Sequence, residues 1–225
     1  MSLDKHYIPK NLSDKVALGF TKFLRFLADT FFKKRYGHRA VVLETVAAVP
    51  GMVAGMLLHL KSLRKMQDDK GWIKILLDEA ENERMHLMTF IHIAKPTLIE
   101  RIIILIAQFI FIITYAIIFI ASQRTAHRIV GYFEEEAVRS YTEYLNELEM
   151  GKIKNIPAPE IAINYWNLPL NATLKDVVKV IRDDEAGNRG VNHSFADIIN
   201  IKIKPKPETS NKVQIKQTQT LNEKN

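Results

Sequence analysis

Hydrophobic residues recur at helical spacing along most of the chain, and short polar segments containing proline, glycine or asparagine separate the periodic stretches. Ser13 is a good N-cap for the first helix, and Lys95-Pro96 ends the third. Residues 151–171 contain three prolines and are expected to form a loop. The predicted helices cover residues 13–32, 39–66, 72–93, 98–121, 122–148 and 173–200, and Pro50-Gly51 is expected to interrupt the second locally.

This pattern predicts one all-α domain over residues 1–200. Residues 1–13 are polar and are expected to be loosely held. Residues 201–225 are polar and Lys-rich, so we expect a disordered tail there. A length of 225 residues and a hydrophobic content of 47% are sufficient for a single domain with a well-formed core.

Two of the predicted helices have the composition of membrane-contacting segments. Residues 102–121 are 20 consecutive residues without a formal charge, which qualifies this helix as a transmembrane candidate. Its length and Ile/Phe content make a fully buried core helix the weaker interpretation. The pattern leaves open whether it crosses the bilayer or lies in one leaflet. In the first helix, basic residues alternate with Leu and Phe, which is typical of an amphipathic helix on an anionic membrane surface.

Charge and cysteine content narrow the function classes. Basic residues exceed acidic ones by 32 − 25 = 7, but no nucleic-acid-binding motif accompanies them, so we expect no nucleic-acid partner. The absence of cysteine excludes disulfides, Cys-ligated zinc and iron–sulfur clusters. No secretory signal or Arg/Ser-rich transit pattern begins the sequence, so either no import is needed or a presequence is not included. The lack of a presequence pattern and the Lys/Ile-rich composition together favour a bacterial inner membrane as the location, and a mitochondrial inner membrane remains open.

Four acidic residues lie on the apolar faces of four different predicted helices: Glu44, Glu83, Glu134 and Glu185. Burying each unpaired carboxylate costs several kcal/mol, unless it is protonated, paired or bound to a metal. The basic residues that could pair with some of them are Arg84, Arg139, Arg182 and Arg189. Two divalent cations are the more economical solution, because they neutralise four carboxylates at once.

The spacing of these acids matches a dimetal four-helix bundle. In such a bundle, two helices each give one Glu and two helices each give a Glu-x-x-His. Here Glu44 and Glu134 are the single acids, Glu83 is followed by His86, and Glu185 is followed by Asn188. Asn188 is a weak metal ligand in place of an expected histidine, so five good protein ligands are predicted. His193 is five residues beyond Asn188 and should face elsewhere. Oxygen-rich ligation favours iron or manganese over zinc.

At this point the chain resembles the alternative oxidases, a family of membrane-bound quinol oxidases. The motifs are LET at 43–45, NERMHL at 82–87, EEEA at 134–137 and DEA at 184–186, although the family's last motif normally continues to a histidine at the position of Asn188. The resemblance implies a ferritin-like four-helix bundle with two additional membrane-contacting helices. It also implies two iron ions held by Glu44, Glu83, His86, Glu134 and Glu185. The implied reaction oxidises ubiquinol and reduces O₂ to water without pumping protons, in a monotopic homodimer on the membrane lipid.

The resemblance also implies roles near the metals. Tyr141 matches a tyrosine that is proposed to act in redox or hydrogen bonding; its simpler interpretation is a buried tyrosine with a satisfied hydroxyl. The implied quinol-binding residues are Arg25, Asp29, Arg39, Leu43, Phe133, Glu136 and Ala137. Arg25 and Asp29 are four residues apart and could equally form an ordinary helix ion pair. Two alternatives remain open: another di-iron quinone-modifying enzyme, and an oxidase homologue impaired by Asn188.

Overall fold

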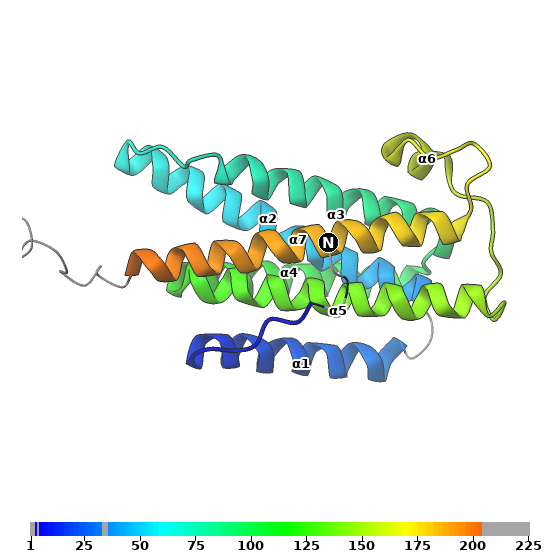
Figure 1. The fold of residues 1–225 in the computed structure, drawn as a ribbon, viewed down its shortest axis with the longest axis horizontal. Helices are drawn as coiled ribbons and strands as arrows, with labels where there is room; N and C mark the ends of the chain where they lie inside the picture. The colour runs from blue at the N-terminus through cyan, green and yellow to red at the C-terminus, as the bar shows by residue number, and fades with distance from the viewer. Residues whose placement is uncertain (1–2, 4, 33–35, 204–225) are drawn as a thin grey trace, which may run out of the picture.

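The computed structural model describes residue 3, residues 5–32 and residues 36–203, and this part of the chain is all-helical. Within these described residues, six long helices and one short helix follow one another in sequence (Figure 1). Their bounds are α1 Leu12–Phe32, α2 Tyr36–Lys65, α3 Trp72–Ala94, α4 Leu98–Ala121, α5 Gln123–Glu149, α6 Glu160–Trp166 and α7 Leu174–Ile203. The predicted all-α class is therefore confirmed.

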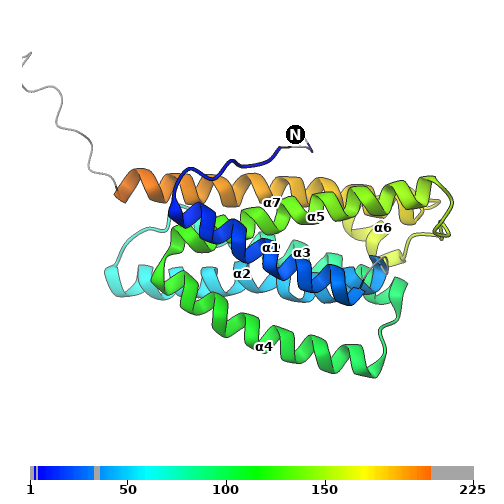
Figure 2. The same cartoon turned by 90° about the horizontal axis from the view of Figure 1, so that it is seen from below.

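Four of these helices form a bundle, and the other two long helices lie outside it. The hairpin of α2 and α3 and the pair of α5 and α7 make the most extensive contacts. Helix α1 lies against α5, while α4 packs mainly on α2 and diverges from the bundle (Figures 1 and 2). The four predicted acids thus come from the four bundle helices, one acid from each.

The bundle interior is filled by large apolar and aromatic side chains. At one end, Phe90 stacks on Tyr141 with ring centroids 5.8 Å apart, and Ile181 is fully buried beside them. At the other end, Trp72 stacks on Phe195 at 4.1 Å. Each fully buried side chain of this size contributes roughly 1.5–3 kcal/mol through the hydrophobic effect. The acids lie between these two apolar ends.

A close approach of α2 and α3 depends on Gly51. A Cβ at this position would overlap the backbone oxygen of Leu76 and lie 3.0 Å from the Cβ of Ala80. Pro50 precedes this glycine and lies inside the helix, which nevertheless runs unbroken from Tyr36 to Lys65. The predicted interruption at Pro50-Gly51 is therefore wrong. Packing against α3 holds the helix together although Pro50 donates no backbone hydrogen bond.

Two other predictions need correction. Residues 151–171 are not entirely a loop, because α6 begins after Pro159 and ends at Trp166. Asn167 caps this helix in a left-handed conformation with φ 51°. A seven-residue helix is too short to show a periodic pattern in the sequence. The segment before α1 is not loosely held where it is described: the backbone N–H of Tyr7 donates to Glu135 at 2.7 Å and its hydroxyl donates to Asp197 at 2.9 Å.

The chain beyond α7 is only partly covered by the structure. Helix α7 continues to Ile203, three residues past the predicted end of the domain. The remainder of the predicted tail lies outside the described residues.

Within the described part, α2 and α4 are both long and apolar enough to cross a membrane, judged by length and composition alone. They differ in their surroundings. More than half of the most apolar window of α2 is buried by the other helices, whereas only about a tenth of that of α4 is buried. The exposed side chains of α4 include Ile102, Leu105, Ile106, Phe109, Ile110, Ile113, Ile117 and Ile120. The predicted apolar helix therefore does not lie inside the core.

Candidate metal centre

The centre of the bundle holds a compact group of buried ligand atoms. Glu44, Glu83, His86 and Glu185 each present one ligand atom, and these atoms all lie within 4.8 Å of one another. All four side chains are buried. Glu134 is also buried and interacts with Glu185, but it does not belong to this compact group. The structure therefore brings the five predicted ligands to one interior region.

His86 lies in the middle of the carboxylates. Its Nδ1 atom is 3.2 Å from Glu185, 3.3 Å from Glu83 and 3.5 Å from Glu44. Its other ring nitrogen, Nε2, faces Asp184 at 3.4 Å. A metal-binding histidine commonly has this arrangement, with one nitrogen toward the ion and the other toward a carboxylate that fixes the ring.

Several of these atoms lack a partner that would compensate their burial. Nδ1 of His86 and one oxygen each of Glu44, Glu83 and Glu185 are buried without a hydrogen bond in the described part of the chain. Buried polar atoms almost always have a hydrogen-bond partner. Four ligand atoms that lie close together without such partners therefore indicate a site that binds cations. Oxygen and imidazole donors in this mixture suit iron or manganese. The residues therefore fit a dimetal group.

Most of the basic residues suggested by the sequence are paired with acids outside the cluster. Arg84 pairs with Glu81 at 2.7 Å and Arg182 with Asp183 at 3.2 Å. Arg139 pairs with Glu136 and Glu143 at 3.3 and 3.7 Å, and Arg189 donates to a backbone carbonyl at 2.9 Å. Three of the four arginines are thus paired with acids outside the cluster.

Burial dominates the electrostatics of the cluster. It raises the pKa of Glu83 to about 7, partly offset by His86, and it raises the pKa of Glu134 well above the usual range. Charge repulsion from Glu185 acts on Glu134 in the same direction. Without cations, the acids could share this space only by holding protons.

Asn188 lies beside the acids and donates a hydrogen bond to one of them. Its Nδ2 atom is 2.8 Å from Oε1 of Glu83 and 3.3 Å from Oδ1 of Asn82. His193 does not take its place, because its ring is 2.9 Å from Glu135 and 2.8 Å from Arg128. Tyr141 donates its hydroxyl to Oε1 of Glu44, and burial raises the pKa of this tyrosine.

The sequence reasoning missed the residues that orient His86. Asp184 accepts hydrogen bonds from Nε1 of Trp166 at 2.8 Å and from Nδ2 of Asn82 at 2.9 Å. The ring of Trp166 also stacks on that of His86 at 5.8 Å. Asn82 directly precedes Glu83, and Asp184 directly precedes Glu185. A polar residue before each of these two acids was the signal in the sequence that could have identified them. Trp166 gave none, because it comes from the predicted loop.

A second buried polar group also escaped the sequence reasoning. Glu79 accepts a hydrogen bond from Asn192 at 2.8 Å, and Asn192 lies 3.0 Å from Nδ1 of His127. Burial raises the pKa of Glu79 to about 8 and lowers that of His127 to about 4. Glu79 is one turn before Glu83 on the same helix face, which was a signal in the sequence.

Four of the predicted quinol-binding residues form one ion-pair group between α1, α2 and α5. Arg25 lies 3.1 Å from Asp29 and also contacts Glu136. Arg39 lies 2.6 Å from the other oxygen of Asp29 and is itself buried. The Arg25–Asp29 helix pair considered in the sequence is therefore present, as part of a larger cluster that joins three helices.

The three apolar residues of that set lie nearby on the same helices. Phe133 is half-buried, with its ring 6.3 Å from that of Phe20 on α1 and 6.0 Å from that of Phe111 on α4. Ala137 packs against the core, and Leu43 is half-buried directly before Glu44. Phe133 thus lies between the bundle and the two outer helices.

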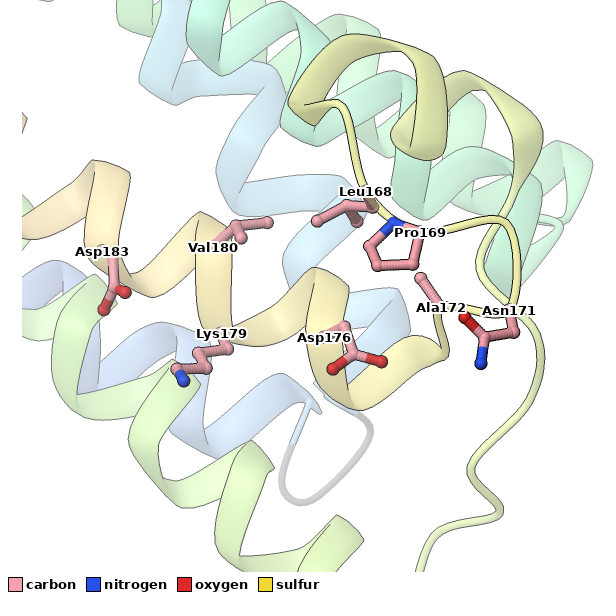
Figure 3. A pocket seen from close by; sticks show the side chains of 8 residues that line it. All are labelled: Leu168, Pro169, Asn171, Ala172, Asp176, Lys179, Val180 and Asp183. Atoms are coloured by element: carbon pink, nitrogen blue, oxygen red, sulfur yellow. The ribbon is translucent and has the colours of Figure 1, made fainter.

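The surface cleft shown in Figure 3 is separate from the cluster. It has a volume of about 400 Å³ and is lined by residues between 168 and 172 and between 176 and 183. None of the five acid or histidine ligands lines it. It lies at the start of α7, where the side chains of Asp176, Lys179 and Asp183 face outward.

The helical bundle and its buried Glu/His cluster fit the class of di-iron carboxylate proteins. The chain belongs to the alternative oxidase family, whose sequence model matches residues 3–197.

Its relatives include three plant proteins. Ubiquinol oxidase 2, mitochondrial, from Glycine max is 60% identical over 198 residues, covering 88% of this chain and 60% of the relative. The protein of the same name from Arabidopsis thaliana is 58% identical over 200 residues, covering 89% and 57%. Ubiquinol oxidase 1a, mitochondrial, from Oryza sativa subsp. japonica is 59% identical over 198 residues, covering 88% and 60%. The chain spans about 60% of the length of these relatives.

Proposed function

We propose that the protein is a membrane-associated ubiquinol oxidase that reduces O₂ to water and pumps no protons. The observation that carries the proposal is the convergence of Glu44, Glu83, His86 and Glu185, with their ligand atoms within 4.8 Å. The relatives that are about 60% identical are named ubiquinol oxidases, which supports ubiquinol as the reductant. Membership of the alternative oxidase family supports O₂ as the oxidant.

In this proposal, Glu44, Glu83, His86, Glu134 and Glu185 hold two iron ions, and Asn188 lies beside them. The ions, when bound, supply the redox chemistry that transfers electrons from quinol to O₂. Carboxylates suit this role because hard oxygen donors stabilise the higher oxidation states of iron. Tyr141 holds Glu44 in place through its hydroxyl, which donates to Oε1.

The proposed quinol site lies at the ion-pair group on α1, α2 and α5. Arg25 and Arg39 supply donors for the quinol oxygens, and Leu43, Phe133 and Ala137 supply apolar surface for the ring. Oxidation releases two protons from the quinol, so acceptors are needed nearby. Burial raises the pKa of Glu136, which makes its carboxylate a better proton acceptor than an exposed one.

The outer helices support one-leaflet membrane attachment in this proposal. Helix α4 exposes a continuous apolar surface, and α1 exposes Val16, Phe23, Phe26 and Leu27 together with the lysines at 15 and 22. Apolar side chains mixed with basic ones suit an anionic lipid surface. The membrane we propose is the mitochondrial inner membrane, because the relatives are named mitochondrial; they give no support to a bacterial one.

A homodimer is also part of the proposal. One face of α2 exposes Met52, Met56, Leu60 and Leu63, which are spaced three or four residues apart. On the neighbouring helix α3, Ile75 and Leu77 are exposed as well. An exposed apolar surface of this kind is typical of a protein–protein interface.

The alternatives make different predictions. Another di-iron quinone-modifying enzyme would hydroxylate its substrate and would not catalyse quinol-dependent oxygen uptake with water as product. A homologue impaired by Asn188 would bind less than two irons per chain and would gain turnover on Asn188→His. The comparisons favour the oxidase, since relatives that are about 60% identical are named ubiquinol oxidases.

The test is iron content and oxygen uptake of the membrane-extracted protein with a ubiquinol analogue, in the presence of cyanide. We expect two irons per chain and cyanide-insensitive uptake, both lost in Glu134→Ala and both retained in Glu143→Ala, which removes an exposed acid from the same helix. Arg39→Ala should raise the KM for quinol and keep the iron, and the exposed Arg64→Ala should change neither. Iron-loaded protein without oxygen uptake would refute the proposed function.

A further inference from the structure

His86 is the one histidine that takes part in the cluster. The chain has seven histidines, and all lie in the described residues. His6 contacts Glu135, and His38 contacts Glu100. His92 contacts the carbonyl oxygen of Met88, and His127 contacts Asn192. His193 contacts both Glu135 and Arg128, and His59 is exposed on α2. No second imidazole therefore reaches the cluster within the described part of the chain.

The amide orientation of Asn188 follows from its neighbours. Nδ2 of Asn82 must face Asp184, because a carboxylate only accepts hydrogen bonds. The oxygen of Asn82 then faces Asn188, so Asn188 must present its own Nδ2 to Asn82 and to Glu83. An amide nitrogen has no lone pair for a metal. Asn188 thus fixes Glu83 and does not add a nitrogen ligand.

The ligand atoms are unevenly distributed as a result. Nδ1 of His86 lies within 3.2–3.5 Å of Glu185, Glu83 and Glu44. Glu134 lies outside this compact set and interacts with Glu185. An ion near His86 has a nitrogen and several oxygens available, whereas an ion on the Glu134 side has carboxylate oxygens alone.

We propose that the two metal positions of this centre are unequal, because Asn188, which stands where the dimetal pattern has a second histidine, donates a hydrogen bond to Glu83 and leaves His86 as the one imidazole of the cluster within the described residues. The proposal rests on the dimetal site of the proposed function. The position without nitrogen binds Fe²⁺ more weakly. It is also the position at which Mn²⁺ competes best, since oxygen donors suit Mn²⁺ and imidazole suits iron.

The experiment is an anaerobic titration of the metal-free full chain with Fe²⁺ against a competing chelator, repeated with Mn²⁺. We expect two binding steps in the unaltered protein. The loss of an outer-sphere partner alone costs roughly 10- to 100-fold in metal affinity, so the two steps should differ by at least tenfold. Asn188→His should strengthen the weaker step and bring the two together. With equimolar Fe²⁺ and Mn²⁺, it should also lower the manganese content.

Two further variants separate ligation from folding. Asn188→Ala removes the hydrogen bond to Glu83 without adding a ligand, so it should weaken Fe²⁺ binding and leave two distinct steps. Asn146→His makes the same exchange at an exposed position of α5 and should change neither step. Circular dichroism of each variant should show the helical content of the unaltered protein.

Two equal Fe²⁺ affinities in the unaltered protein, or a folded Asn188→His variant with unchanged steps, would overturn the proposal. These results leave the proposed function standing if the same preparation oxidises ubiquinol. Failure to bind any Fe²⁺ would overturn both the inequality and the di-iron function. Normal stepwise binding without quinol oxidation would overturn the proposed function alone.

Discussion

Replacing Gly51 by alanine tests whether the close approach of α2 and α3 maintains the metal centre. The new Cβ would overlap the carbonyl oxygen of Leu76, a backbone atom that cannot rotate away. It would also lie 3.0 and 3.1 Å from the Cβ and the nitrogen of Ala80. The two helices must therefore separate locally. Gly51 is seven residues beyond Glu44, and Ala80 is three residues before Glu83, so the separation moves these two acids apart.

The magnitude follows from two opposing effects. Alanine is favoured over glycine within a helix by about 0.5–1 kcal/mol. Overpacking of a tight contact costs typically about 1–3 kcal/mol, and here the clash involves backbone, so the cost exceeds the gain. For a protein of this size, each kcal/mol corresponds to about 2–4 °C in Tm. Gly51→Ala should therefore lower Tm by several degrees and reduce the iron retained after dialysis against a chelator.

The assay is thermal unfolding by circular dichroism combined with iron analysis. Gly19→Ala is the matched control, because a Cβ at that helical position meets nothing within 4 Å. It should raise Tm slightly and leave the iron content unchanged. If Gly51→Ala were as stable as Gly19→Ala and kept its iron, the contact between α2 and α3 would not position the acids.

Three further predictions concern single side chains. Asp184→Asn removes the carboxylate facing Nε2 of His86 and should weaken iron binding roughly 10- to 100-fold, measured by chelator competition; unchanged affinity would contradict the orienting role. Tyr141→Phe removes the donor to Glu44 but keeps the ring, so oxygen uptake should fall roughly 10-fold or more with iron retained. His127 has a pKa lowered to about 4 by burial, so the unfolded chain binds its proton between pH 6.5 and 4 while the folded chain does not. The free energy of unfolding should therefore fall by up to about 3 kcal/mol as the pH is lowered through this window, and His127→Gln should remove that part of the pH dependence in denaturant titrations.

The helices were predictable because their apolar periodicity is long and uninterrupted. For example, the sequence predicts a helix at 98–121, and α4 extends over Leu98–Ala121. Pro50 misled the prediction because a local rule was applied where packing against α3 decides the outcome. The short helix α6 was missed because seven residues carry no periodic signal.

The candidate site was predictable where acids break an apolar pattern. Glu44, Glu83 and Glu185 stand out in this way, and they lie together in the structure. The partners of His86 were not predictable in the same way. Trp166 is 80 residues further along the chain than His86, and only the fold brings the two rings together.

The number of buried acids implies that metal binding and folding are coupled in this protein. Burial raises the pKa of Glu83 to about 7 and that of Glu79 to about 8. Glu79 has a hydrogen bond from Asn192, so it can remain buried as a neutral acid. Glu83 and its neighbours instead have ligand atoms without hydrogen-bond partners, so burying this cluster without cations would carry a cost that the unfolded chain does not. Binding of cations removes that cost in the folded state only, which makes the metals a source of stability as well as of chemistry.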